Sequence, residues 1–121
     1  MTLFHIANSE YIINASSADA RVSSTFATTQ DSLINLYHRV IQEKVKAAWN
    51  GKIVSERTIN QNDYKGLEVE YTRLFEGVND VPVTTRIFLI EGSLVEFDIL
   101  DLKKSGLESI KKEFFNSIRV K

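Results

Sequence analysis

The chain has 121 residues and a mass of 13.8 kDa, the size of one domain with a core of its own. Hydrophobic residues make up 43% of the sequence and charged residues 26%, a balance that excludes a disordered chain and a coiled coil. Fifteen basic and sixteen acidic residues give a net charge of -1, which argues against nucleic acid and anionic membranes as partners. Because the chain has no cysteine, disulfides, thiolate nucleophiles and cysteine-based zinc sites are excluded. We expect a single domain over residues 1–121.

The sequence has no segment that predicts a membrane span or an export signal. Its longest apolar run is far shorter than the roughly 20 residues that a transmembrane helix needs. Residues 1–20 lack the basic segment and continuous apolar segment of a signal peptide. The sequence as it stands predicts a cytoplasmic protein. A periplasmic or membrane-anchored protein is the alternative if a signal or lipid anchor preceded residue 1, and a cysteine just upstream would indicate the lipid anchor.

The first part of the chain predicts strand, loop and long helix. Residues 4–15 are apolar enough for one or two short strands, and the small polar residues 16–29 predict a loop. Thr28 and Asp31 resemble a helix start, with a capping hydroxyl and an acid near the positive helix end. Apolar residues then recur every three or four positions over residues 33–48, which predicts an amphipathic helix ended by Asn50-Gly51.

Two β-hairpins are predicted after the helix. Residues 53–59 and 67–72 fit two strands joined by a turn at residues 61–63. A second turn at residues 77–82 leads into residues 84–100, where two apolar runs flank Glu91-Gly92. With Glu91 and Gly92 as the turn, the facing pairs are Ile90 and Ser93, Phe88 and Val95, Arg86 and Phe97, and Thr84 and Ile99. Because both faces of this hairpin are apolar, we expect it to be the central pair of a sheet, with a helix on at least one face.

A second amphipathic helix is predicted near the C-terminus. Ser105 or Gly106 opens it, and an apolar stripe runs over residues 107–118. Residues 119–121 predict a short final strand. The order of elements predicts an α+β fold in which a central antiparallel sheet is flanked by helices, an α/β/α sandwich.

Three segments carry a resemblance to a known family. They are YKGLEVEY at residues 64–71, TRIFLIEG at residues 85–92 and FFNSIRV at residues 114–120. A glycine before a strand, an arginine-containing hairpin and a closing helix with a Phe-x-x-Ser-Ile tail resemble the PsbP/Mog-type superfamily, including the bacterial DcrB-like proteins. The resemblance covers about residues 10–121 and is one of topology more than of motif.

This resemblance implies a helix-flanked antiparallel sheet and a function in binding rather than catalysis. Members of the superfamily include a thylakoid photosystem subunit, a partner of the small GTPase Ran and bacterial chaperone-like proteins that hold secreted effectors. These proteins use different surfaces, so the resemblance transfers no functional residue to this chain.

The sequence contains none of the common catalytic motifs. His5 and His38 are the only histidines, and neither has a second ligand at helical spacing, so no metal site is predicted. No serine lies in a Gly-x-Ser-x-Gly turn, and the isolated glycines form no phosphate-binding loop. We therefore predict no cofactor and no catalytic residue from motifs.

Four carboxylates are the best candidates for chemistry. Glu68 and Glu70 share one face of a predicted strand, and Glu96 and Asp98 share one face of another. If the two strands bring all four together with Arg57 or Arg73, the group could bind a hard cation or act in acid-base catalysis. The other interpretation is that they are solvated residues paired with neighbouring basic side chains.

Aromatic residues are the candidates for binding a partner. Adjacent Phe114 and Phe115 cannot both lie on one narrow helical stripe, so we expect that one of them is exposed. Together with Phe75 or Tyr64 it would form an apolar patch for a protein partner or for self-association. The other interpretation is a wide buried face of the last helix, with all these rings in the core.

We expect a non-catalytic protein-binding, chaperone or accessory module that holds a protein partner at a sheet edge or an apolar patch, and that forms a homodimer. Two alternatives stay open: a small metal-dependent or acid-base enzyme that uses the four carboxylates, and the domain of a peripheral lipoprotein. A deep pocket that contains Glu70, Glu96 and an arginine would favour the enzyme, whereas a flat apolar patch would favour the binding module.

Overall fold

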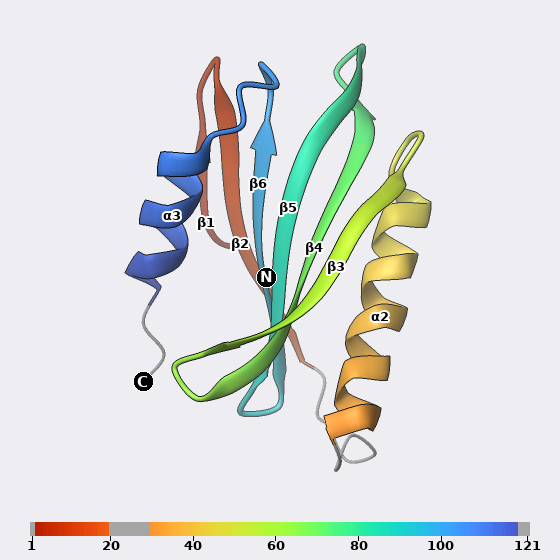
Figure 1. Ribbon diagram of the computed structural model, residues 1–121, viewed down its shortest axis with the longest axis vertical. Coiled ribbons are helices and arrows are strands. Elements are labelled where there is room, and N and C mark those ends of the chain that lie inside the picture. Colours follow the sequence, from red (N-terminus) through yellow and green to blue (C-terminus); the bar gives the residue numbers. More distant parts are fainter. Residues whose placement is uncertain (1, 20–29, 119–121) are drawn as a thin grey trace.

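The computed structural model of the protein describes residues 2–19 and 30–118 (Figure 1). In chain order the described elements are β1 (Thr2–Ala7), β2 (Tyr11–Asp19), α2 (Gln30–Ala47), β3 (Lys52–Gln61), β4 (Tyr64–Phe75), β5 (Val78–Ile90), β6 (Ser93–Asp101) and α3 (Glu108–Ser117). Figure 1 shows the strands as one twisted sheet, with α3 and α2 on opposite sides of it. This is the helix-flanked α+β fold that the sequence predicts.

The six strands form one antiparallel sheet in the order β1-β2-β6-β5-β4-β3. β5 and β6 are its middle pair, so the predicted central hairpin is confirmed. Glu91 and Gly92 make the turn, both with positive φ, and all four predicted facing pairs are present. A two-residue turn leaves no freedom in the register of the strands that it joins, which is why this part of the fold is predictable.

The N-terminal region forms two strands, and β2 extends further than predicted. Residues 16–19 belong to β2, although their small polar side chains predict a loop. β2 pairs with β6 along its whole length, from Tyr11 opposite Asp101 to Asp19 opposite Ser93. Pairing with a neighbouring strand overrides a weak local preference, because the sheet supplies the backbone hydrogen bonds.

The first described helix fits its predicted span, and the last helix begins later than predicted. α2 is followed by Asn50 at positive φ, in the predicted turn with Gly51, while the predicted N-terminal residue Thr28 lies outside the described residues. α3 begins at Glu108 because the carboxylate of Asp101 accepts the backbone N–H groups of residues 105 and 106, at 3.0 and 2.7 Å, and holds them in the loop. The predicted final strand at residues 119–121 lies outside the described residues.

α2 covers one face of the sheet, which we call the α2 face. Tyr37 of α2 is hydrogen-bonded to the sheet. Its hydroxyl donates to the carbonyl of Lys65 at 2.8 Å and accepts from the backbone N–H of Leu89 at 2.7 Å. Buried core residues on this face are Tyr37, Ile41, Val45, Leu67, Val69, Tyr71, Val83 and Ile87. One helix residue therefore connects α2 to two strands, β4 and β5.

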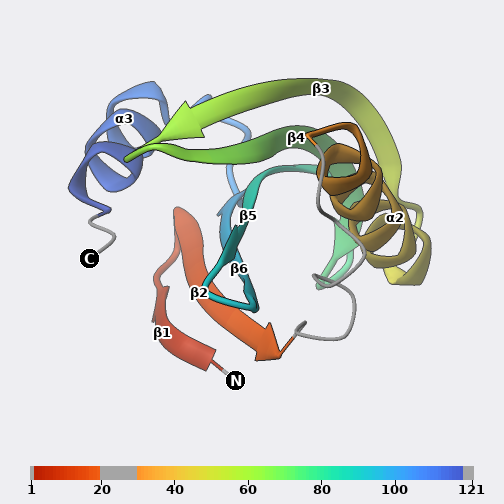
Figure 2. The ribbon, with the colours of Figure 1, turned by 90° about the horizontal axis from the view of Figure 1, so that it is seen from below.

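α3 covers the other face, which we call the α3 face (Figure 2). Its buried core residues are Ile13, Ala15, Phe88, Phe97, Ile99 and Phe115. Gly66 in β4 lies opposite Phe88 in β5, and a Cβ atom at this glycine would meet the Phe88 ring at 2.5 Å. The glycine is required at this position because the Phe88 ring crosses the backbone of the neighbouring strand.

Candidate functional site

A chain of aromatic rings connects the α3 core with the molecular surface. The Phe114 ring contacts the rings of Phe4, Phe97 and Phe115, with centroids 5.7, 6.2 and 5.4 Å apart. Phe97 in turn contacts Phe88 edge to face at 6.2 Å. Such tilted and edge-to-face pairs are favourable beyond the area they bury. The series therefore runs from the buried middle of the sheet to the exposed ring of Phe4.

β1 exposes large apolar side chains beside this series. Leu3, Phe4 and Ile6 have exposed fractions of 48%, 39% and 48%. Phe4 lies opposite Ala15 of β2 and Ile6 lies opposite Ile13, so both side chains point to the α3 face. We call the surface formed by Phe4, Ile6 and Phe114 the β1–α3 surface.

A cavity of about 310 Å³ adjoins this surface, between α3 and β2. It is lined by Tyr11, Ile13, Ile110, Glu113, Phe114 and Ser117. Phe114 therefore both contacts Phe4 and lines the cavity. A groove lined by apolar and polar side chains, next to exposed apolar residues of a strand, is a feature of protein-binding surfaces.

The four aromatic residues singled out by the sequence lie in two places. Tyr64, Phe114 and Phe115 belong to the core under α3, where Phe115 is buried and Phe114 is half-buried. Of the adjacent pair, Phe114 is thus the residue that reaches the surface. Phe75 lies at the opposite end of β4 from Tyr64, roughly 35 Å away along an extended strand, and cannot join the same patch.

Phe75 lies instead in a second apolar region, at the end of the sheet where α2 leads into β3. The guanidinium of Arg73 lies 5.5 Å from the centre of its ring. Trp49, with an exposed fraction of 74%, lies at this end because its carbonyl accepts the N–H of Leu74 at 2.7 Å. Val78, which faces Phe75 across the β4–β5 turn, is exposed as well.

The first carboxylate pair lies on the α3 face. Glu68 accepts hydrogen bonds from Nε of Arg57 at 2.8 Å and from Nε of Arg86 at 2.6 Å. Burial by itself would raise the pKa of Glu68, but the two arginines outweigh it and hold the pKa below its usual value. The guanidinium of Arg86 also lies 4.0 Å from the centre of the Phe115 ring, so α3 covers the ion pair.

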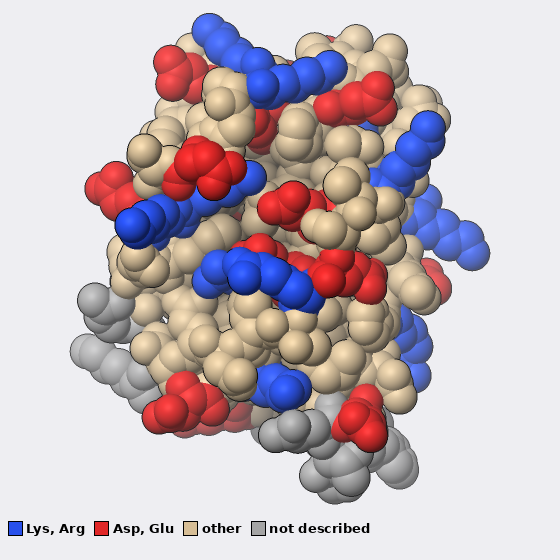
Figure 3. Space-filling model, in the orientation of Figure 1, with Lys and Arg blue, Asp and Glu red and all other residues tan. Residues whose placement is uncertain are grey.

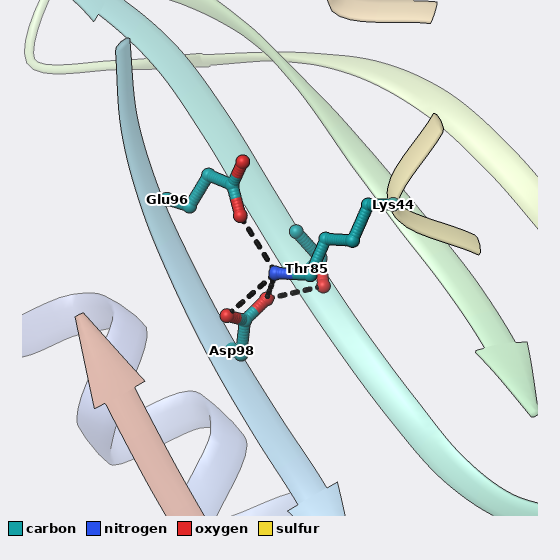
Figure 4. A network of polar contacts seen from close by, with 4 residues as sticks. All are labelled: Lys44, Thr85, Glu96 and Asp98. Atoms are coloured by element: carbon teal, nitrogen blue, oxygen red, sulfur yellow. Dashed lines mark hydrogen bonds and ion pairs between the residues drawn. The ribbon is translucent and has the colours of Figure 1, made fainter. Parts of the chain in front are cut away.

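The second carboxylate pair lies on the α2 face. Nζ of Lys44 contacts Glu96 at 2.6 Å and both carboxylate oxygens of Asp98 at 2.8 Å (Figure 4). Thr85 donates to Asp98 at 2.5 Å. Burial by itself would lower the pKa of Lys44, but the charges of Asp98 and Glu96 outweigh it and raise the pKa above its usual value.

The predicted four-carboxylate group therefore does not form. Glu68 and Glu70 point to the α3 face, whereas Glu96 and Asp98 point to the α2 face, with β5 between the two strands. A cavity of about 290 Å³ beside α3 contains Glu70, Arg57 and Arg86, but Glu96 is on the far side of the sheet. Within residues 2–19 and 30–118, no group of three or more acidic or histidine side chains is placed to hold a metal ion.

The two histidines lie apart. Nδ1 of His38 on α2 is 3.1 Å from Glu56 of β3, and His5 is exposed on β1. Arg73, which was considered as a partner for the carboxylates, donates to the carbonyl of Leu74 and lies over Phe75 instead.

The sequence did not predict the apolar surface of β1 or the ion pairs of Lys44. A strand is predicted in this region, but its exposed apolar side chains are not, because the alternation in TLFHIA is weak; three large apolar residues within six positions are the signal. Lys44 had a clearer signal, because it interrupts the apolar stripe of the helix between Ile41 and Ala48. A charge inside an apolar stripe predicts an acidic partner on the facing element.

The comparisons support the fold. No protein-family model matches the sequence, and a comparison with curated proteins gives no match. The crystal structure of PA94 from Pseudomonas aeruginosa, a protein of unknown function suggested to be a regulator, is similar with a TM-score of 0.75 and 12% identity. That match covers 98% of this chain and 81% of PA94.

The solution structure of cyanobacterial PsbP (CyanoP) from Synechocystis is also similar, with a TM-score of 0.53 and 10% identity. The match covers 90% of this chain and 64% of CyanoP. At such identities the likeness shows the fold alone, and it confirms the PsbP-like α+β architecture. The Mog-like and DcrB-like relationships stay predictions from the sequence.

Two observations bear on other kinds of partner. No helix within the described part of the chain is long and apolar enough to cross a membrane. In the view of Figure 3, basic and acidic side chains alternate over the surface without forming a region of one sign. A field of one sign is what nucleic acid and anionic lipid surfaces require.

Proposed function

We propose that the protein is a non-catalytic binding module that holds a protein partner on the β1–α3 surface, in an accessory or chaperone role. The observation that carries the proposal is the exposure of Phe4 and Ile6 on the α3 face, where Phe4 contacts Phe114. Exposed apolar side chains in a continuous group on a small domain mark interaction surfaces. The fold shared with PA94, itself suggested to be a regulator, is compatible with an accessory role.

The contacts of the carboxylates favour binding over catalysis. Glu68 is neutralised by two arginines, and Asp98 is neutralised by Lys44 and hydrogen-bonded by Thr85. An acid-base catalyst or a cation ligand needs lone pairs that are free to meet the substrate or the ion. Glu68, Glu96 and Asp98 are thus paired with basic side chains of the fold, so the enzyme is the weaker of the two functions.

The proposal is tested by photo-crosslinking in the cells that produce the protein. p-Benzoylphenylalanine is placed at position 4, and in a matched control at position 54, because Val54 is an exposed apolar residue on the opposite edge strand. Irradiation is expected to give discrete adducts with one or a few polypeptides at position 4 and none of these at position 54. The substitution Phe114→Ser should weaken the adducts.

Identical adducts at both positions, or no adduct at position 4, would contradict the proposal. Adducts between two copies of the chain would show that the partner is a second copy, as the homodimer prediction has it. The proposal also fails if a metal ion or a metabolite co-purifies with the chain and the Glu68 or Asp98 variants no longer retain it.

A further inference from the structure

We propose that the partner binds as an extended polypeptide segment that adds an antiparallel or parallel strand to the outer edge of β1. This inference rests on the proposed function, because it specifies how a protein partner uses the β1–α3 surface. A strand added at a sheet edge gains affinity from main-chain hydrogen bonds and specificity from side chains on alternate positions.

The backbone of β1 leaves two residues directed to the open edge. The N–H of Asn8 donates to the carbonyl of Tyr11 at 3.0 Å, so Asn8 points toward β2. The direction of the backbone N–H and C=O groups alternates along an antiparallel strand. Those of Ile6 and Phe4 therefore point toward β2 as well, whereas those of His5 and Ala7 point away from the sheet.

The other side of β2 gives the same alternation. The carbonyl of Glu10 accepts a hydrogen bond from the backbone N–H of Leu102, so the backbone polar groups of Glu10 point toward β6. Those of every second residue after it do the same. The intervening residues Tyr11, Ile13 and Ala15 then point toward β1, where they face Asn8, Ile6 and Phe4. The N–H and C=O groups of His5 and Ala7 are therefore available to a further strand, and no described residue pairs with them.

The two edges of the sheet differ in chemistry. β3, at the opposite edge, carries Lys52, Glu56 and Arg57 within its ten residues. Charged side chains on an edge strand are a common protection against pairing with other chains. β1 has no lysine, arginine, acid or proline, and His5 is its one titratable residue. The edge at β1 can therefore pair with a further strand, whereas charged side chains disfavour such pairing at β3.

Side chains on β1 indicate which segment fits. Phe4 and Ile6 point to the α3 face, beside Phe114. Side chains directly opposite or diagonal in adjacent strands lie about 5 to 8 Å apart, so alternate residues of an added strand would contact these two residues. The segment that fits has large apolar residues at every second position and no proline in its middle.

The size of the edge favours a peptide segment over a second copy of the chain. β1 has six residues, whereas a stable dimer interface engages roughly 20 to 30 residues on each side. Two copies joined through β1 alone would fall far short of that size. A flexible segment can follow the short edge and place its side chains against Phe4 and Ile6 without bringing a second domain into contact.

The experiment separates the backbone of His5 from its side chain. Labelled peptides selected from a random phage-displayed library on the full chain serve as probes, and their affinities are measured by fluorescence anisotropy. His5→Pro removes the outward N–H, whereas the matched control His5→Ala keeps it, and neither changes Phe4 or Ile6. Proline is tolerated where the N–H of an edge strand faces outward, and the far-UV circular dichroism of each variant monitors folding.

We expect the selected peptides to carry apolar residues at alternate positions, to bind wild type and His5→Ala alike, and to bind His5→Pro about tenfold more weakly. Ala7→Pro, with Ala7→Ser as its control, should reproduce the loss even if His5→Pro proves unstable. Equal binding to the proline variants and their controls overturns strand addition, and so does the absence of any selected peptide.

Two further outcomes keep this inference distinct from the proposed function. If the proline variants bind normally but Phe114→Ser abolishes binding, the partner docks on side chains alone and the binding module stands without strand addition. If sedimentation shows a dimer that His5→Pro dissociates and His5→Ala does not, a second copy occupies the edge and the peptide proposal is wrong.

Discussion

On one face of the sheet α2 is held by charged and hydroxyl groups as well as by packing, whereas on the other face α3 is held by aromatic rings and two side-chain amides. Lys44 and Tyr37 of α2 both bond directly to strands. α3 contributes Phe114 and Phe115, and Phe115 covers an arginine–glutamate pair that lies within the sheet. Directional bonds fix a helix at one position, while ring packing leaves apolar surface at its margin. The face with fewer polar bonds is therefore the one suited to binding.

The largest expected effect is on the α2 face. Asp98→Ala should lower the free energy of unfolding by about 3 kcal/mol, because it leaves Thr85 and part of the charge of Lys44 without their buried partner. Glu96→Ala is the matched control and should cost about 1 kcal/mol, since Lys44 keeps Asp98. Urea denaturation measures both. Equal losses would show that the two carboxylates share the charge of Lys44 equally.

The second effect concerns the hydroxyl of Tyr37. Tyr37→Phe should lower the free energy of unfolding by about 2 kcal/mol, because the carbonyl of Lys65 and the N–H of Leu89 both lose a buried hydrogen-bond partner. Burial raises the pKa of Tyr37 to about 12, an effect that the hydrogen bond from Leu89 partly offsets. A raised pKa means that stability is full below about pH 10 and is lost as the pH rises toward 12.

The loss of stability at high pH can be measured directly. The urea midpoint of the wild type should fall above about pH 10, and the fall should be shallower in Tyr37→Phe. The loss of stability that remains in Tyr37→Phe arises from Lys44 and Tyr71, whose pKa values are also raised in the folded state. Parallel curves for the two proteins would show that Tyr37 does not contribute.

A smaller effect is expected on the α3 face. Glu68→Gln should lower the free energy of unfolding by about 1 kcal/mol at neutral pH, because the amide oxygen can still accept a hydrogen bond from the partly buried Arg86, while the attraction of the largely exposed Arg57 is screened by water. The pKa of Glu68 is lowered in the folded state, so its contribution is present above about pH 4.5 and is lost as the pH falls. The variant should therefore show a weaker loss of stability in acid than the wild type. If stability falls in acid as steeply in the variant as in the wild type, the pairing of Glu68 with the two arginines is contradicted.

The smallest effect on stability is expected at the surface proposed for binding. Phe4→Ser should cost less than about 1 kcal/mol, since the ring is partly exposed and loses one edge-to-face contact with Phe114. The same variant should lose most of the peptide binding of the wild type. Val54→Ser, on the opposite edge, should change neither quantity. A large loss of stability in Phe4→Ser would assign Phe4 to the core instead.

Sequence patterns predicted the parts of the fold that depend on local geometry. The turn at Glu91-Gly92 has two residues, so strand alternation fixed both the register and the faces of β5 and β6. The turn between β4 and β5 is less regular, with a register shift between Arg73 and Phe75. Because a shift of one residue exchanges the faces of a strand, the faces of Glu68 and Glu96 could not be related from the sequence.

The binding surface depends on information that a single sequence does not contain. Phe114 reaches the surface and Phe115 does not, because the two rings leave α3 in different directions and only Phe115 meets Arg86. Phe75 is separated from both by the length of β4. The exposure of Phe4 follows from the edge position of β1, which depends on β2 pairing with β6. Long-range pairing determined each of these features.

The turn between β3 and β4 has a consequence for the order in which the molecule assembles. Gln61 and Asn62 donate from their side-chain amides to the carbonyls of Phe115 and Ile118, at 2.7 and 3.2 Å, while Gln61 also accepts from Arg86. These contacts join residues more than fifty positions apart, so they form only after the hairpin exists. We expect α3 to be the last described element to become protected from hydrogen exchange during refolding and among the first to lose that protection.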